Sequence, residues 1–322
     1  MVTHEGFSKQ MLDYWGAPIE RPLAISRLKR ASKELRYDNE PGRRFLREVE
    51  QALGIERNRI RRVHWELFQE GLYQWVIRLT ATAPNLNRSL CLIVAKNAGR
   101  FSKVCRKEWE LLSVLHQRNS EQVVRPFGAF EIPLDGDRPV ELVAYFTEWL
   151  HGFTELGLDK DHKFAMVGIE DVNFMNAQQS DEIRFGILEL LATLFEPETG
   201  SALLDVEVNS GDFLISLSGG NPRIRLIAAR LLRTGLSPAG FLRGVLRPMG
   251  AHADKDVFLH PSEPMETVEA LVRGLSRALG GRSKAVAFLE KAYKKEIRSG
   301  APCPSGHFDW PEFEMALEAI RL

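Results

Sequence analysis

The sequence predicts an α+β protein of two lobes, and three observations indicate it. Residues 60–150 hold several apolar runs of strand length, with one helical stretch between them. After residue 150, apolar side chains recur mostly at helical spacing, interrupted by Gly and Pro. A chain of 322 residues is also long enough for two domains. We therefore expect a helical extension (1–59), a sheet lobe (60–150) and a helical lobe (151–322).

The elements of the sheet lobe follow from changes in apolar period. A helix is expected in "PGRRFLREVEQALGI", where Pro41 begins it and Gly54 ends it. In "IRRVHWELF", apolar and charged side chains alternate, which is typical of a half-buried strand. Four more strands are expected in "WVIRLTA", "LCLIVAKN", "VVRPFGAFEI" and "VELVAYFTEWL". The amphipathic helix "SKVCRKEWELLSVLHQR" lies between the third and fourth strands. The lobe is thus an antiparallel five-stranded sheet with one inserted helix.

The helical lobe contains an acidic turn between two apolar runs. The stretch "LLDVEVNSGDFLI" (203–215) carries Asp205, Glu207 and Asp212. A strongly apolar helix, "EIRFGILELLATLF", precedes this turn, and "DFLISLS" with "RIRLIAA" predicts a hairpin around it. The later helices are expected in "PAGFLRGVL", "METVEALVRGLSRALG", "KAVAFLEKAYKKEI" and "WPEFEMALEAI". Such a turn is either a site or a solvated loop, because Asp and Asn favour turns.

Composition excludes several classes of function. Lys plus Arg total 43 and Asp plus Glu total 43, so no global field favours nucleic acid or an anionic membrane as a partner. Cys91, Cys105 and Cys303 are odd in number and far apart, which argues against a disulfide framework and favours a reducing cytoplasm. No apolar stretch has the length of a signal peptide core or a membrane span. We expect a cytoplasmic protein.

The order of these elements resembles the protein-kinase-like fold, in its aminoglycoside phosphotransferase and choline kinase branch. There a helix ending near "ALG" leads into "I..V..L..G....V.R", as "ALGIERNRIRRVHWELFQEGLYQWVIRL" does here. The resemblance covers roughly residues 42–232 and depends on order and spacing more than on any one motif. It implies a two-lobed fold with a nucleotide site on the sheet side.

The resemblance implies a cation for the phosphates of ATP. In the family, a lysine on the third strand supplies it, and a carboxylate on the next helix holds that lysine. Lys96 ends the third strand here, and Glu108 lies in the following helix, with Glu110 as the alternative. The alternative is that Lys96 is an ordinary surface lysine and that Glu108 is a solvated helix residue.

The resemblance also implies residues around the base and the phosphates. Gly71 in "FQEGLYQ" corresponds to the loop over the phosphates, although any hairpin favours a glycine. The stretch "FTEWLHGFTEL" resembles the hinge, so the C=O of Glu148 and the N–H of Leu150 would face adenine. Thr147 would line the pocket, with Val94 above the ring. The alternative is an edge strand that leaves its sheet.

The acidic turn resembles the family's catalytic loop with altered residues. Gly211 and the strand "FLI" fix the register, which sets Asp212 on the metal-binding asparagine and Glu207 on the catalytic aspartate. Asp205 falls on the leading histidine. The family's second metal-binding aspartate, in "LID", corresponds to Ala228 in "RLIAARLL".

These departures weaken phosphate transfer. A glutamate carboxylate reaches about 1 Å further than that of aspartate, and such a misplacement can cost about a hundredfold in rate. Alanine removes an oxygen ligand for magnesium or manganese, although Glu207 and Asp212 could still hold an ion between them.

Three functions remain open from the sequence. The first is a degenerate kinase-like protein of the pseudokinase type, which binds a nucleotide or a partner and transfers little phosphate. The second is an active ATP-dependent phosphotransferase for a small molecule, using Glu207 and Asp212. The third is a helical interaction protein whose sheet binds no nucleotide. The sequence indicates no acceptor substrate, partner protein or pathway.

Overall fold

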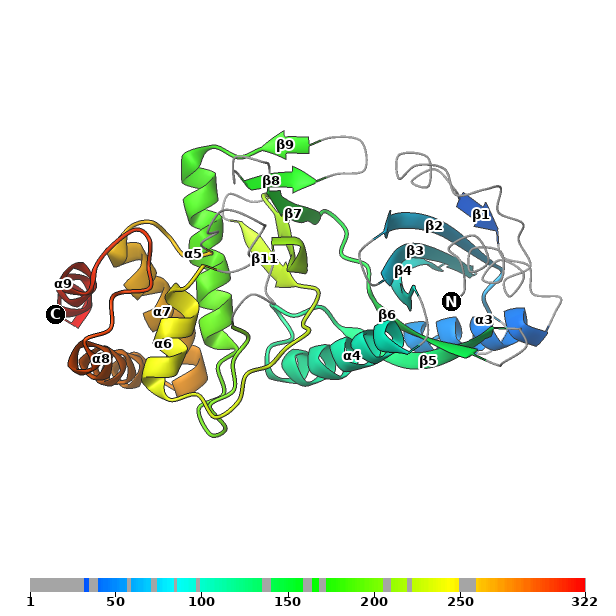
Figure 1. Cartoon of the computed structure of the whole chain (residues 1–322). Helices are drawn as coiled ribbons and strands as arrows, with labels where there is room; N and C mark the ends of the chain where they lie inside the picture. The colour runs from blue at the N-terminus through cyan, green and yellow to red at the C-terminus, as the bar shows by residue number, and fades with distance from the viewer. Residues whose placement is uncertain are drawn as a thin grey trace. The chain divides into compact units, whose positions relative to one another are not determined.

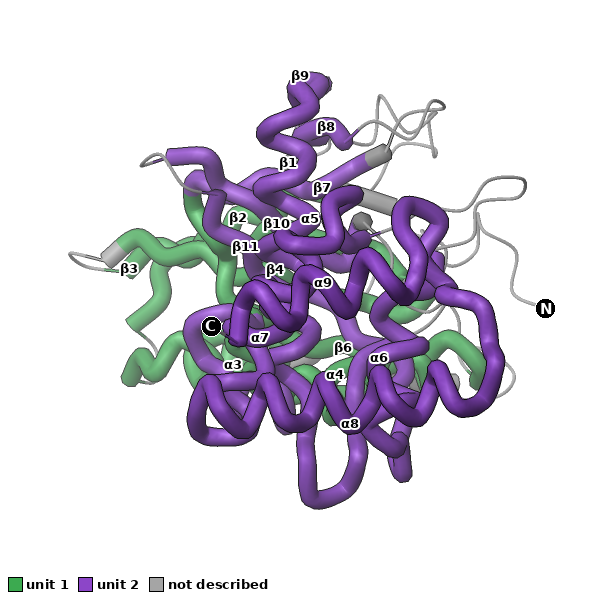
Figure 2. Tube along the Cα trace, turned by 90° about the vertical axis from the view of Figure 1, so that its left-hand side faces the viewer, with its two compact units in different colours: residues 1–113, 124–151 green, residues 114–123, 152–322 purple. Residues whose placement is uncertain are grey.

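The computed structural model describes residues 32–34, 40–56, 59–70, 74–83, 86–96, 99–134, 140–158, 164–167, 172–204, 210–218, 222–248 and 259–321. The chain divides into two compact units (Figure 2). The first, the sheet unit, comprises residues 1–113 and 124–151, and the second, the helical unit, comprises residues 114–123 and 152–322. The fold is α+β, with an antiparallel sheet in each unit (Figure 1).

In its described residues, the sheet unit has six antiparallel strands in the order β1-β2-β3-β4-β6-β5. The strands are β1 (Ser32–Glu34), β2 (Arg62–Glu70), β3 (Gln74–Ala83), β4 (Leu86–Ala95), β5 (Pro126–Leu134) and β6 (Val140–Glu148). Helix α3 (Glu40–Leu53) precedes β2, and α4 (Arg100–Arg118) is inserted between β4 and β5, at the places that the sequence predicts.

The prediction of five strands was one short. Strand β1 comes from the segment expected to be a helical extension and pairs antiparallel with β2, with Ser32 opposite Glu66. Its three residues are too few to show an apolar period. It is recognised as a strand only because it pairs with the edge of β2.

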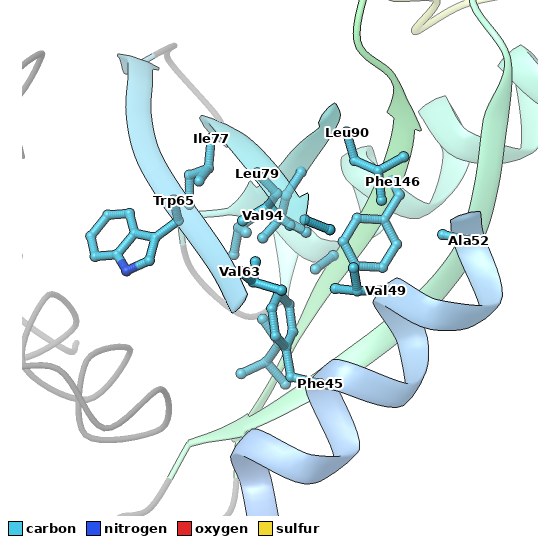
Figure 3. Close-up of a cluster of buried hydrophobic side chains, with 14 of the residues drawn as sticks. Phe45, Val49, Ala52, Val63, Trp65, Ile77, Leu79, Leu90, Val94 and Phe146 are labelled. Atoms are coloured by element: carbon cyan, nitrogen blue, oxygen red, sulfur yellow. The ribbon is translucent and has the colours of Figure 1, made fainter. Parts of the chain in front are cut away.

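One face of this sheet carries the apolar core of the unit. Alternate residues of β2, β3, β4 and β6 point to this face, because side chains on a strand have a period of two. Helix α3 covers it with Phe45 and Val49, which are 1% and 0% exposed (Figure 3). The sheet contributes, among others, Val63, Trp65, Ile77, Leu79, Leu90, Val94 and Phe146.

The opposite face is more polar and is partly covered by α4. The Ser102 hydroxyl near the start of α4 accepts a hydrogen bond from the Val143 N–H at 3.1 Å. One turn later, the Cys105 thiol donates to Gln74 Oε1 at 3.5 Å, and the Trp109 Nε1–H donates to the carbonyl of Phe127. The sheet therefore separates an apolar layer under α3 from a polar face bordered by α4.

The helical unit contains a second antiparallel sheet, in the order β11-β10-β7-β8-β9. Its strands are β7 (Thr154–Leu158), β8 (Phe164–Val167), β9 (Val172–Phe174), β10 (Phe213–Ser216) and β11 (Arg223–Leu226), with the short helix η1 (Ser210–Asp212) before β10. The sequence predicts only the β10–β11 hairpin. The other three strands are short, and β7 joins the hairpin through Glu155, opposite Leu214.

Five helices follow the predicted order in this unit. They are α5 (Ala177–Thr193), α6 (Pro238–Leu246), α7 (Pro264–Leu279), α8 (Arg282–Ser299) and α9 (Trp310–Arg321). Helix α5 begins with a capping box, in which Asn176 and Gln179 exchange side-chain to backbone hydrogen bonds. Its residues Ile183, Ile187 and Leu191 are fully buried, as expected for a strongly apolar helix. Among the described residues, no helix is both long and apolar enough to cross a membrane.

Candidate nucleotide-side and catalytic-loop residues

Glu108, one of the two carboxylates considered for the lysine on the sheet side, is buried. It is fully inaccessible to solvent on α4, whereas Glu110 is exposed. The Tyr145 hydroxyl of β6 lies near the Glu108 carboxylate, and burial together with this charge raises the pKa of Tyr145 well above its ordinary value. A buried carboxylate is costly unless it is paired. Of the two candidates, Glu108 is therefore the one that faces the sheet.

Lys96 comes directly after the last residue of β4 and is half-buried. It thus ends the third of the five predicted strands, as the sequence indicates. Its pairing with Glu108 stays a prediction.

Val94 and Thr147 lie on opposite faces of the sheet. Thr147 is the cross-strand partner of Cys91, three residues before Val94, so the two side chains point in opposite directions. Val94 is 0% exposed and packs in the core under α3. The Thr147 side chain hydrogen-bonds the Cys91 thiol, and burial raises the pKa of Cys91 to about 12, so this thiol stays protonated. Thr147 and Val94 therefore do not line the same face of the sheet.

The predicted hinge begins where β6 ends, at Glu148. The Glu148 N–H donates to the carbonyl of Arg125 at 3.0 Å, and the Arg125 N–H donates to Glu148 Oε1 at 2.9 Å. The Thr147 hydroxyl reaches the Glu148 carbonyl at 3.4 Å. Leu150 is half-buried. The contacts of Glu148 and Leu150 with adenine stay predictions, and Gly71 lies outside the described residues.

Arg78 and Trp149 were not identified from the sequence, and both border the polar face. Arg78 on β3 is the cross-strand partner of Cys91, which is itself the partner of Thr147. Its guanidinium lies 5.0 Å from the centre of the Trp149 ring, and Phe68 packs edge-on against that ring at 5.1 Å. The signal was present in "WVIRLTA", where Arg78 alternates with core residues and so faces away from the core. This face therefore carries a half-buried cation beside the predicted hinge.

In the helical unit, Asp212 is held by a buried ion pair. Asp212 ends η1, and its carbonyl accepts a hydrogen bond from the Ile227 N–H at 2.8 Å, which continues the register of the β10–β11 hairpin. Its side chain is 3% exposed, and Oδ1 lies 2.7 Å from Nη1 of Arg230. Arg230 lies two residues beyond Ala228 in "RLIAARLL". The charge of Asp212 is thus balanced by Arg230, which lies shortly after the end of β11.

The described residues at this hairpin do not fit a divalent metal ion. Ala228 is 6% exposed and supplies only a methyl group. An ion at Asp212 would compete with the Arg230 guanidinium for the same carboxylate. No group of three or more metal-ligating side chains occurs in the described part of the chain. Asp205 and Glu207 lie outside that part, so their roles stay predictions.

Comparison with known proteins adds little to this geometry. The sequence matches no family model and no curated protein. A solved structure described as "WaaP in complex with acyl carrier protein" matches 80% of this chain and 88% of that chain, at 12% sequence identity. The TM-score of this match is 0.33.

Proposed function

We propose that this protein is a degenerate kinase-like protein that acts by binding and transfers little or no phosphate. The main support for this proposal is the buried ion pair of Asp212 with Arg230. Phosphoryl transfer in kinase-like sites depends on metal ions that bridge the phosphates and neutralise the charge of the transition state. Arg230 already neutralises the acid that corresponds to one metal ligand, and Ala228 replaces the other. The hairpin is therefore arranged for structure and not for metal binding.

Features of the polar face of the sheet unit favour a ligand site there. Glu108 is buried beside Tyr145, and Thr147 with Arg78 lies on the same face near the end of β6. A phosphate-binding lysine is commonly held by a carboxylate. We assign Lys96 as that lysine and Glu108 as its carboxylate. We take ATP as the ligand, held by Lys96 and the hinge without a metal ion.

Thermal melting of the full chain with ATP tests this function. ATP should raise the melting temperature equally in the presence of EDTA, magnesium or manganese, because a ligand that binds only the folded state stabilises it by mass action. Glu108→Gln should reduce the ATP-dependent shift, whereas Glu110→Gln, on the exposed side of the same helix, should leave it unchanged.

Two outcomes would contradict the proposal in different ways. A shift that requires magnesium, with steady ATP turnover, would show an active phosphotransferase. No shift with ATP under any condition would favour the helical interaction protein that binds no nucleotide.

A further inference from the structure

A groove in the helical unit lies between the start of α6 and the exposed side of α8, which are neighbours in the fold (Figure 1). It encloses about 600 Å³. Its lining residues are Ser237, Pro238, Ala239, Ala287, Glu290, Lys291, Lys294, Lys295 and Arg298. None of them belongs to the hairpin or to the polar face described above, so the groove is a separate feature.

The groove is strongly basic in a chain whose formal charges cancel. Four of its lining residues are cationic and one, Glu290, is acidic. Glu290 is already engaged, because its carboxylate lies 3.2 Å from Arg321 and 3.8 Å from Lys294. Within the part of the chain that the structure describes, Lys291, Lys295 and Arg298 are exposed and form no ion pair. A local positive field of this kind attracts an anionic partner.

The cations are arranged as a line along one helix. Residues 291, 294, 295 and 298 are spaced as i, i+3, i+4 and i+7, so they share one face of α8 over about 10 Å. The opposite wall is apolar and small, formed by Pro238 and Ala239 at the start of α6. Ser237 caps this helix by accepting a hydrogen bond from the Gly240 N–H at 3.1 Å, and the helix start adds partial positive charge.

We propose that this groove binds an acidic helical segment of a partner protein. Carboxylates spaced at i, i+3 or i+4, and i+7 on such a helix match the line of cations on α8. The small residues of the opposite wall leave room for one apolar side chain between the acids. A single phosphate would need cations that converge on one point, and a membrane would need a flat surface, whereas these cations follow a groove. The site is independent of the proposed nucleotide function.

Fluorescence anisotropy with the full chain tests the groove. The probe is a labelled synthetic helical peptide with glutamates at i, i+3, i+4 and i+7 and a leucine between them, and its match carries glutamine at those positions. The wild type should bind the glutamate peptide and release it as salt rises, because exposed charges are screened. The variant Lys291→Gln/Lys295→Gln/Arg298→Gln should bind it at least about fivefold more weakly, since each surface ion pair contributes modestly.

The control is Lys107→Gln/Lys284→Gln, which removes two exposed lysines outside the groove and should bind as the wild type does. Equal binding of the two peptides, or equal binding by the groove variant and the wild type, would overturn the proposal. So would failure of the glutamate peptide to bind while phosphatidylglycerol vesicles or inorganic pyrophosphate bind the wild type and not the groove variant. Circular dichroism should show that all variants keep the wild-type fold, because the altered side chains are exposed.

Discussion

At the scale of single residues, the buried pair of Asp212 and Arg230 decides how the hairpin is interpreted. Two charges that leave water together are tolerated only while both remain, since removing one leaves the other uncompensated. Asp212 is nearly inaccessible and Arg230 is 22% exposed. We therefore expect the pair to stabilise the fold and to compete with a metal ion for Asp212.

Arg230→Gln should therefore lower the free energy of unfolding by about 3 kcal/mol, a typical cost of breaking a buried ion pair. Urea unfolding measures it. The double variant Asp212→Asn/Arg230→Gln should recover most of the loss, because no charge is then left buried. As a control, Arg273→Gln breaks an exposed pair with Glu269 and should cost under about 1 kcal/mol. Additive losses in the double variant would show that the pair is not coupled.

A second residue-scale prediction concerns His260, which is fully buried. Burial lowers the pKa of His260 to about 4, and its Nδ1–H donates to the carbonyl of Pro261 at 2.7 Å. Between pH 6.5 and about 4, His260 is protonated in the unfolded chain but stays neutral in the folded protein. Stability should therefore fall by up to about 3 kcal/mol as pH falls through this window. His307 beside it contributes in the same direction, because partial burial lowers its pKa too.

Urea unfolding from pH 7.5 to 4.5 measures this dependence. In His260→Gln the dependence should become shallower, whereas His151→Gln, at an exposed position, should keep the wild-type slope. An unchanged slope in His260→Gln would assign the acid sensitivity to other groups.

At the scale of elements, the contact between α5 and α7 depends on one glycine. A Cβ added at Gly274 would overlap the carbonyl oxygen of Glu189 and lie 2.6 Å from the Cβ of Ala192. Gly274→Ala should thus force the two helices apart and destabilise the protein by about 1–3 kcal/mol. Urea unfolding checks this. Gly240→Ala in α6 is the matched control, because its Cβ meets only ordinary contacts and should be neutral or stabilise by up to about 1 kcal/mol.

The β10–β11 hairpin supports another element-scale prediction. Ala228 lies one residue beyond Ile227, which hydrogen-bonds Asp212, so an aspartate at 228 would lie beside that acid. Ala228→Asp alone should bind no metal, because Arg230 still neutralises Asp212. With Arg230→Gln added, the Arg230 guanidinium no longer competes for the Asp212 carboxylate, and manganese should raise the melting temperature. If the double variant folds and manganese leaves its melting curve unchanged, the register assigned from Gly211 is wrong.

At the scale of the whole molecule, the chain should not turn over ATP. With ATP and magnesium, the protein should release no phosphate above a blank, because we propose that Ala228 replaces one metal ligand and that Arg230 neutralises the other, Asp212. A coupled phosphate-release assay measures this. Glu207→Gln should behave as the wild type does. Steady turnover that Glu207→Gln abolishes would show that residues 205–209 complete a working site.

Local patterns in the sequence determined most elements of this fold. Apolar runs of strand length, with clear alternation in the first, located five strands of the first sheet. Helical spacing located α3 to α9, and the acidic turn located Asp212 beside its hairpin. These features depend on neighbours within one strand or one turn, which a linear pattern records.

Only the tertiary structure decided which side chains share a face of a sheet and which residues distant in the chain are in contact. The pairing register separated Val94 from Thr147 and aligned Arg78 with Cys91. Strand β1 and the three strands β7 to β9 are short, and they form by pairing with neighbouring strands. Arg230 reaches Asp212 across a hairpin, and nothing in either segment alone specifies that pair. Contacts between residues distant in the chain depend on register and packing, so one sequence cannot display them as a period.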